Sequence, residues 1–349
     1  MPSPPWRKSA SANASEARRI GFPENFLPST FAPETMRSIT LGSSSLSVSR
    51  LAYGCWRIAG GPDPAGVTPA EEAGGRRAVI AAFEAGCTLF DLADVYCEGV
   101  CEKIFGAALR EVSGMRERVV IASKCGIRKR GEPDAFAPYR YDFSAAHLVK
   151  SVEQSLQRIG IETLDVLLLH RPDFLCDPAE VAGAFSGLRQ AGKVREFGVS
   201  NFSPSQFTAL QSACPMGLLA NQVEISLACL GRFTDGTLDH CLAEKITPMA
   251  WSPLAGGRLT ETLPIDINAP DHAKRIAVRE TLEQIARVRR ATRAQIAFAW
   301  LLKHPAGIIP IIGSANVKHI QAAAQAAAIE LSREEWYRLM EAAHGQRLP

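Results

Sequence analysis

The feature that most constrains the fold of this chain is a regular alternation of short apolar segments with longer helical ones. From residue 50 onward, apolar segments of strand length recur, and nearly all are followed by a segment with helical periodicity. The predicted strands are apolar throughout, which is typical of a parallel sheet covered on both faces. They lie at residues 50–56, 87–91, 118–123, 164–169, 194–199, 218–223, 247–251 and 307–312.

The segments between the strands complete a repeating unit. We predict helices at residues 70–85, 99–111, 144–159, 178–191, 204–213, 237–245, 272–289, 292–303, 316–327 and 332–344, and a hairpin at 38–49. Eight strand–helix units in about 310 residues favour a (β/α)8 TIM barrel with an N-terminal hairpin and extra C-terminal helices. An open doubly wound sheet is the alternative, but no G-x-G-x-x-G phosphate turn follows the first strand.

Composition excludes several classes of protein. The chain has 349 residues, 46% of them hydrophobic and 21% charged, which suits a soluble globular protein with a large core. The net charge of +3 is spread along the chain, without the basic stripe that nucleic-acid binding needs. No apolar run reaches the roughly 18 residues of a membrane span. We therefore expect neither a nucleic-acid nor a membrane partner, and a monomer or small homo-oligomer.

The nine cysteines are odd in number and irregular in spacing, and several lie inside apolar strands. Reduced thiols in a cytoplasmic protein are the interpretation that this pattern favours. Cys97 and Cys101 flank one loop, but two ligands without a second pair make a weak metal site, so no metal is predicted.

Residues 1–35 differ in composition from the rest, being rich in Ser, Ala and Pro without a sustained apolar period. We interpret them as a disordered tail, arising from a start codon upstream of Met36, with the barrel domain spanning 36–349. A secretory signal would need an apolar core, and an organelle transit peptide would not carry the acids Glu16, Glu24 and Glu34.

Polar side chains follow three neighbouring predicted strands. The segment FDLADVY (90–96) brings Asp91 and Tyr96, while Lys124 follows strand 118–123 and His170 follows strand 164–169. Taken singly, these residues are also compatible with a turn cap, a loop aromatic, a solvated strand end and a packed core histidine. Because all strands of a parallel barrel end on one face, we expect the four side chains to meet there.

Such a set has a defined chemistry. A tyrosine with its ordinary pKa of about 10 is a poor acid at neutral pH, and a nearby ammonium is expected to lower that pKa. The phenol can then donate a proton to a carbonyl oxygen that gains charge, while the histidine orients that oxygen. A hydride donor is still needed, and only a cofactor can supply one.

At this point the chain resembles the aldo-keto reductase family. The matching segments are FDLADVY, VVIASKCG, LDVLLLHRPD, GVSNF (198–202), NQVEISL (221–227), AWSPLAGGRL (250–259) and PIIGS (310–314), and they extend over residues 38 to about 340. Within the family, SKCGI, HRPD and GVSNF are most similar to the bacterial YdhF-type oxidoreductases. The resemblance implies that Asp91, Tyr96, Lys124 and His170 form a catalytic tetrad.

The resemblance also implies a nicotinamide site. Ser200, Asn201 and Gln222 match residues that hydrogen-bond the carboxamide, and Trp251 stands where most members carry a tyrosine that stacks on the ring. The alternatives are a helix cap for Ser200 and Asn201 and core packing for Trp251. The remaining predicted cofactor residues, from the first strand end, the pyrophosphate loop and the last strand end, are Gly54, Trp56, Ser252, Leu254, Gly256, Arg258, Gly313, Ser314 and Lys318.

NADPH is favoured over NADH on Ser314 and Lys318, although Ala315 and Asn316 stand where the family often places a basic residue. The expected substrate is a small carbonyl compound. Loops 57–69, 126–143 and 224–236 are expected to rim its site, with an aromatic set (Trp56, Tyr139, Tyr141, Phe143 and Phe233) and a basic set (Arg57, Arg128, Lys129 and Arg130). The aromatic set favours an apolar or aromatic carbonyl compound, whereas the basic set is compatible with an anionic substrate or with a merely solvated loop.

The sequence thus predicts an NADP-dependent oxidoreductase that reduces an aldehyde or ketone to the alcohol. Two alternatives stay open. The chain is also compatible with a nicotinamide-sensing regulatory subunit, as the potassium-channel β subunits that resemble this family partly are. The other alternative is an aldolase-type barrel in which Lys124 forms a Schiff base.

Overall fold

The computed structural model of the protein describes residues 36–260 and 271–348. The chain divides into two units, Met1–Glu34 and Thr35–Pro349, and the description below concerns the second. The interpretation of residues 1–35 as a tail lies outside the described residues. So does part of the polar loop expected after strand 247–251.

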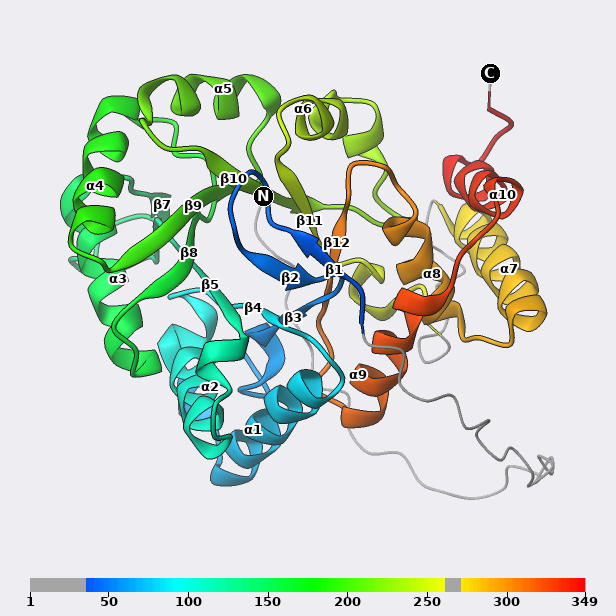
Figure 1. Ribbon diagram of the computed structural model, residues 1–349, viewed down its shortest axis with the longest axis horizontal. Helices are drawn as coiled ribbons and strands as arrows, with labels where there is room; N and C mark the ends of the chain where they lie inside the picture. Colours follow the sequence, from blue (N-terminus) through cyan, green and yellow to red (C-terminus); the bar gives the residue numbers. More distant parts are fainter. Residues whose placement is uncertain (1–35, 261–270, 349) are drawn as a thin grey trace. The chain divides into compact units, whose positions relative to one another are not determined.

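Eight parallel strands of the described chain close into a barrel, which confirms the predicted fold class. Around the ring, neighbours in space follow the order of the chain, as in a barrel of strand–helix units (Figure 1). The barrel strands are β3 (Ala52–Gly54), β4 (Leu89–Asp91), β5 (Val120–Cys125), β8 (Leu164–Leu169), β9 (Val194–Ser200), β10 (Leu218–Glu224), β11 (Thr247–Trp251) and β12 (Ile309–Ile312).

The helices surround the strands, and α7 and α10 lie side by side outside them (Figure 1). Their bounds are α1 (Pro69–Glu84), α2 (Val100–Glu111), α3 (Ala145–Ile159), α4 (Pro178–Gln190), α5 (Pro204–Ala213), α6 (Thr237–Ala243), α7 (His272–Arg289), α8 (Arg293–Leu302), α9 (Val317–Ala324) and α10 (Arg333–His344). Several begin with side-chain caps that the sequence shows, such as the capping box of Thr68 and Glu71 on α1.

Two predicted elements end earlier than expected. The first barrel strand stops at Gly54, because Cys55–Arg57 turn into a 3-10 helix. The helix predicted at 316–327 is α-helical only to Ala324 and continues as a 3-10 turn over Gln325–Ala328. The loop predicted at 126–143 contains a small antiparallel pair, β6 (Ile127–Arg128) with β7 (Arg140–Tyr141).

The predicted hairpin, β1 (Ser38–Thr40) with β2 (Ser47–Ser49), covers the amino-terminal end of the barrel. Gly42 N donates to Thr247 Oγ1 at the first residue of β11, at 2.7 Å. Leu41 and Val48 are buried and pack in one apolar cluster with barrel residues such as Val166 and Met249. The hairpin therefore closes the end of the barrel opposite to the one where the strands finish.

All nine cysteines are free thiols, and seven of them are buried. Among the described residues, no helix combines the length and apolar character needed to cross a lipid bilayer.

Close packing of α2 against the end of α3 generates a stability prediction. A Cβ at Gly106 would overlap the carbonyl oxygen of Ile159, whereas nothing lies within 4 Å of a Cβ at Gly183 in α4. Gly106→Ala should lower the free energy of unfolding by about 2 kcal/mol despite the better helix propensity of alanine. Gly183→Ala, the matched control, should raise it by about 0.5–1 kcal/mol. Denaturant titration measures both, and equal stabilisation by the two variants would refute the packing argument.

Candidate active site

The carboxyl ends of the barrel strands carry the predicted site residues on one face. The strand register sets Gly54 of β3 beside Asp91 of β4, and Asp91 beside Ala122 of β5. Lys124 lies two residues beyond Ala122, so its side chain emerges from the same strand one layer nearer the open end. His170 directly follows β8, and its N–H donates to Cys125 O at 2.9 Å.

The ammonium of Lys124 is at the centre of this set. Its Nζ lies 2.8 Å from Asp91 Oδ1, 3.0 Å from the Tyr96 hydroxyl and 2.7 Å from Leu92 O. Asp91 is 3% and Lys124 1% exposed, so the ion pair is shielded from water. Burial lowers the pKa of Lys124, but Asp91 and Tyr96 outweigh it and raise the pKa above the ordinary value. Lys124 is therefore a fixed, fully charged hydrogen-bond donor.

The Tyr96 hydroxyl does not have the lowered pKa that the sequence argument predicted. Burial raises its pKa above 10, and the Lys124 ammonium offsets only part of that rise. The prediction was wrong because it counted the charge of the neighbour and left out desolvation of the phenolate. Tyr96 is thus a protonated phenol at neutral pH, whose anion Lys124 stabilises when it forms.

His170 packs edge-on against Tyr96, with ring centroids 5.8 Å apart. Burial lowers the pKa of His170 well below 6.5, and the charges of Lys124 and Arg171 lower it further. The imidazole is therefore neutral, with one nitrogen carrying a proton and the other able to accept one. Its Nδ1 is buried without a hydrogen-bond partner in the structure.

The residues predicted to hold the nicotinamide lie together at the ends of β9, β10 and β11. Asn201 Nδ2 donates to Ser200 Oγ at 2.8 Å, and Asn201 Oδ1 accepts from Trp251 Nε1 at 3.0 Å. Ser200 Oγ donates to the carbonyl oxygen of Gln222 at 2.8 Å. Asn201 has a positive φ of 64° and lies two residues before Ser203, the residue that caps α5, so the capping role falls to Ser203.

A hydrogen bond between two side chains that the sequence did not indicate joins the predicted catalytic and cofactor sets. Gln222 Nε2 donates to Asp91 Oδ1 at 2.7 Å, the same oxygen that pairs with Lys124. The Gln222 amide nitrogen was predicted to face a carboxamide, but it donates a hydrogen bond to Asp91 on another strand of the barrel. The connection runs from Tyr96 through Lys124 and Asp91 to Gln222.

The predicted pyrophosphate residues form a separate loop after β11. Ser252, Ala255 and Gly256 have positive φ angles, and the space beside the Gly256 Cα is open. Leu254 packs against the core, while Arg258 is exposed and donates from Nε to Ala255 O at 2.8 Å.

Beyond β12, Gly313 is exposed with open space beside it, and the Ser314 carbonyl accepts from the buried Tyr53 hydroxyl at 3.1 Å. Asn316 caps α9 by accepting from Lys318 N at 2.9 Å, and the Lys318 side chain is exposed. At the first strand end, a Cβ on Gly54 would meet Ile311, whereas Trp56 is 49% exposed beneath the Arg57 guanidinium.

A cavity of about 650 Å³ adjoins Asn201 and Trp251 and contains residues that the sequence analysis missed. Arg171 lies with its guanidinium carbon 5.5 Å from the centroid of the Trp251 ring. Glu224 ends β10 beside Trp251, and burial raises its pKa while Arg258 and Arg171 oppose the rise. Glu224 directly follows a predicted strand and Arg171 is the second residue after β8, and this position at a strand end is the signal that could have identified them.

Part of the predicted rim is not at the rim. Phe143 is buried and stacks on Phe202, with centroids 6.4 Å apart, and Phe233 packs against Trp300 at 5.2 Å. These aromatic rings complete the core because apolar partners from later parts of the chain reach them. Tyr141 does line the cavity.

The basic set does not converge either. Arg128 pairs with Asp142 and Lys129 with Glu98. These charges are neutralised by acids close to them, which leaves the set without the concentrated positive field that an anionic substrate would need.

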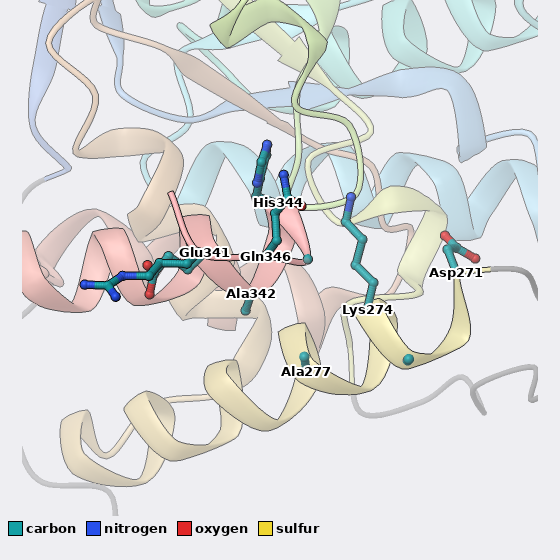
Figure 2. Close-up of a pocket in the computed structure, with 10 residues that line it drawn as sticks. Asp271, Lys274, Ala277, Glu341, Ala342, His344 and Gln346 are labelled. Atoms are coloured by element: carbon teal, nitrogen blue, oxygen red, sulfur yellow. The ribbon is translucent and has the colours of Figure 1, made fainter. Parts of the chain in front are cut away.

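A larger cavity of about 880 Å³ lies far from this chemistry, between the start of α7 and the end of α10 (Figure 2). Figure 2 shows Asp271 and Lys274 on one side and Glu341 and His344 on the other. None of the predicted site residues lines it. In the described parts of the chain, no group of three or more metal-ligating side chains is placed to hold a metal ion.

Comparison with known proteins agrees with this geometry. Residues 50–344 match the model of the aldo/keto reductase family. The chain is 41% identical to the oxidoreductase YdhF of Escherichia coli over 267 residues, covering 76% of this chain and 86% of YdhF. It is 38% identical to a 6-dehydroglucose reductase of Novosphingobium aromaticivorans over 314 residues, covering 88% of this chain and 96% of that protein.

Among solved structures, the glycerol dehydrogenase AKR11B4 from Gluconobacter oxydans superposes with a TM-score of 0.79 at 27% identity, covering 88% of this chain and 95% of that one. The barrel, the strand-end residues and these matches lead to one conclusion. The chain belongs to the aldo/keto reductase family and is close to its YdhF-type oxidoreductases.

Proposed function

We propose that this protein reduces an aldehyde or ketone to the alcohol with NADPH, and that Tyr96 is the proton donor. The observation that carries the proposal is the 3.0 Å contact of the Tyr96 hydroxyl with Lys124 Nζ, itself 2.8 Å from Asp91 Oδ1. Membership of a family of nicotinamide-dependent oxidoreductases supports the reaction class.

The side chains present fit a nicotinamide cofactor. An indole ring at Trp251 stands beside the amide of Asn201 and the hydroxyl of Ser200, groups that suit a flat ring with a carboxamide. Open space at Gly256 and Gly313, near Arg258 and Lys318, suits phosphates. When bound, the nicotinamide supplies the hydride that no protein side chain can provide.

Each member of the tetrad then has a separate task. Tyr96 donates its proton to the carbonyl oxygen of the substrate as that oxygen gains negative charge. Lys124 stabilises the phenolate that remains, and Asp91 keeps Lys124 charged and in place. Neutral His170, edge-on to Tyr96, orients the same carbonyl oxygen through a ring N–H.

The two alternative functions, a Schiff-base enzyme and a regulatory subunit, have less support. A Schiff base needs a neutral amine, whereas Asp91 holds the pKa of Lys124 high and the side chain is buried. A purely regulatory subunit would have no need for the tetrad, and here its members are in contact.

The cavity beside Trp251 supports a polar, hydroxyl-rich carbonyl substrate. Its wall combines the rings of Trp251 and Tyr141 with hydrogen-bonding side chains from Asn201, Gln206 and Glu224. Aromatic faces with amide and carboxylate groups suit the apolar and hydroxyl surfaces of a sugar-like aldehyde. The similarity to a 6-dehydroglucose reductase supports the same class.

We further propose that residues 36–349 form the catalytic domain, that it acts in the cytoplasm, and that it is a monomer or small homo-oligomer. The family match over residues 50–344 supports the domain bounds, and the nine free thiols suit a reducing compartment.

Replacing the proton donor should separate binding from turnover. Tyr96→Phe should bind NADPH as the wild type does in a fluorescence titration, because the phenol oxygen is not needed there. Turnover with a panel of aldehydes, sugar-like aldehydes included, should fall about 10²–10⁴-fold. Tyr337→Phe on α10 is the control and should change neither quantity. An unchanged rate in Tyr96→Phe would remove Tyr96 as the donor.

The pKa directions predict a flat pH profile for reduction. Reduction needs a protonated Tyr96, so its rate falls only above the raised pKa of that phenol. It also needs neutral His170, whose pKa is well below 6.5. Single-turnover rates of NADPH oxidation should therefore stay constant from about pH 7 to about pH 9. A rate that declines steadily across this range would contradict the assignment of the two groups.

The choice between the two cofactors should depend on Lys318. Lys318→Met removes the exposed ammonium near the start of α9, so the Kd for NADPH should rise about tenfold while that for NADH stays the same. Lys303→Met is the matched control. Lys303 directly follows α8 and lies before the amino-terminal end of β12, opposite to the end that leads to Lys318. Equal weakening of both cofactors by Lys318→Met would show that no 2′-phosphate is held there.

A further inference from the structure

The turn that follows Tyr96 has an unusual backbone. Cys97 has φ 44° and ψ 44°, Glu98 has φ 52° and ψ 37°, and Gly99 has φ 86° and ψ −2°. Residues other than glycine adopt this left-handed conformation singly, not in runs, because Cβ approaches the following carbonyl oxygen. Such a run persists only where the surrounding structure imposes it. The turn must therefore be held by its neighbours.

The main neighbour is the side chain of Arg158, from the last turn of α3. A Cβ on Gly99 would lie 2.5 Å from Arg158 Cδ, so the arginine packs directly on the bare glycine backbone. Arg158 Nε donates to Glu102 Oε2 at 2.6 Å, and its Nη2 donates to Ser155 Oγ at 3.2 Å. Glu102 lies in the first turn of α2, only three residues beyond Gly99.

Glu102 also reaches the strand that carries Lys124. Its side chain is fully buried, and Oε1 accepts from Ser123 Oγ at 2.7 Å. Ser123 and Lys124 are neighbours in β5 and point to opposite faces of the sheet. The backbone adds a second tie, since Asp94 N donates to Lys124 O at 3.0 Å.

A second carboxylate faces the same guanidinium. Asp94 lies two residues before Tyr96, and its Oδ1 is buried without a hydrogen-bond partner in the structure. Burial and the Glu102 carboxylate raise the pKa of Asp94 to about 7, against the opposing influence of Arg158 and of Ser151. Arg158 is thus the cation for two acids that lie on either side of Tyr96 in the sequence.

We propose that Arg158 and Glu102 are positioning residues, which hold the left-handed turn at Gly99 and so fix the Tyr96 hydroxyl against Lys124. Both partners of that 3.0 Å contact depend on the buried pair, Tyr96 through the turn and Lys124 through Ser123. The inference rests on the proposed function only in taking Tyr96 as the proton donor.

The chain offers a matched control at the other end of the barrel. Arg116 Nη1 pairs at 3.0 Å with Asp165, whose side chain is 1% exposed and lies at the second residue of β8. Arg158→Met and Arg116→Met each remove a guanidinium from a buried carboxylate, so both should reduce stability, the second one less because Arg195 stays 2.9 Å from Asp165. Only the first should disturb Tyr96.

Two measurements test the proposal on the full-length protein. With saturating NADPH and an aldehyde that the wild type reduces, Arg158→Met should lower kcat about 10- to 100-fold. The Kd for NADPH, measured by fluorescence, should stay within about twofold, because the pair does not line the cofactor site. Arg158→Lys should recover part of the lost kcat, and Arg116→Met should keep the wild-type value.

The second measurement needs no turnover. In protein labelled with ¹³Cζ-tyrosine, the Tyr96 resonance is assigned by its loss in Tyr96→Phe. It should move in Arg158→Met and stay unchanged in Arg116→Met. If Arg158→Met does not fold, Glu102→Gln replaces it, because it removes the charge of the pair and leaves the backbone at Gly99 unchanged.

The outcomes distinguish the positioning role of Arg158 from the proposed function. Equal losses of kcat in Arg158→Met and Arg116→Met, or an unmoved Tyr96 resonance, overturn the positioning role. A wild type that reduces no carbonyl compound refutes the proposed function instead, and the resonance still decides whether Arg158 holds Tyr96.

Discussion

The structure of the site depends on the need to satisfy a buried ammonium. An amine as buried as Lys124 would cost several kcal/mol if it were left without partners. Its three acceptors, on Asp91, Leu92 and Tyr96, all come from the six-residue segment that begins at the last residue of β4. Satisfying one charge therefore sets the path of that segment against β5. The Tyr96 hydroxyl is positioned by the same contacts that stabilise the buried charge.

The two ends of the barrel divide the tasks of stability and chemistry. The amino-terminal end is closed by the hairpin, whose Leu41 and Val48 continue the apolar interior. A buried charge at this end, Asp165, is paired with Arg116 and Arg195. The carboxyl-terminal end keeps its polar groups inside and opens to the cavity beside Trp251. Because the amino-terminal end of the barrel is apolar and closely packed, the polar residues at the carboxyl-terminal end can be arranged for reaction with little loss of stability.

Much of this architecture was readable from the sequence, and the exceptions have physical reasons. Strand β8 and helix α5 were predicted at their observed bounds, because an apolar run and a Ser-Pro cap mark their limits. The strand-end residues were found because polar groups interrupt apolar runs. The hydrogen bond from Gln222 to Asp91 was not predicted, since it joins residues 131 positions apart and no local pattern reports it.

Other misses have the same origin. Phe233 was expected at a rim, yet it packs against Trp300 and Trp336, which lie far along the chain. The sign of the Tyr96 pKa shift depends on desolvation, which spacing does not measure. Arg158 and Glu102 look in sequence like ordinary charges on helices α3 and α2. Their role depends on a left-handed turn that only the three-dimensional structure shows.

A raised pKa at Tyr96 is compatible with its task once the partner is considered. As a carbonyl accepts hydride, its oxygen approaches an alkoxide, which is a much stronger base than a phenolate. The proton transfer is then downhill even from a phenol that burial keeps protonated. Lys124 lowers the energy of the phenolate at that moment, and not before it. In the proposed reaction, burial and the neighbouring charge thus act on different steps, and a phenol that is a weak acid in the resting protein can serve as the proton donor.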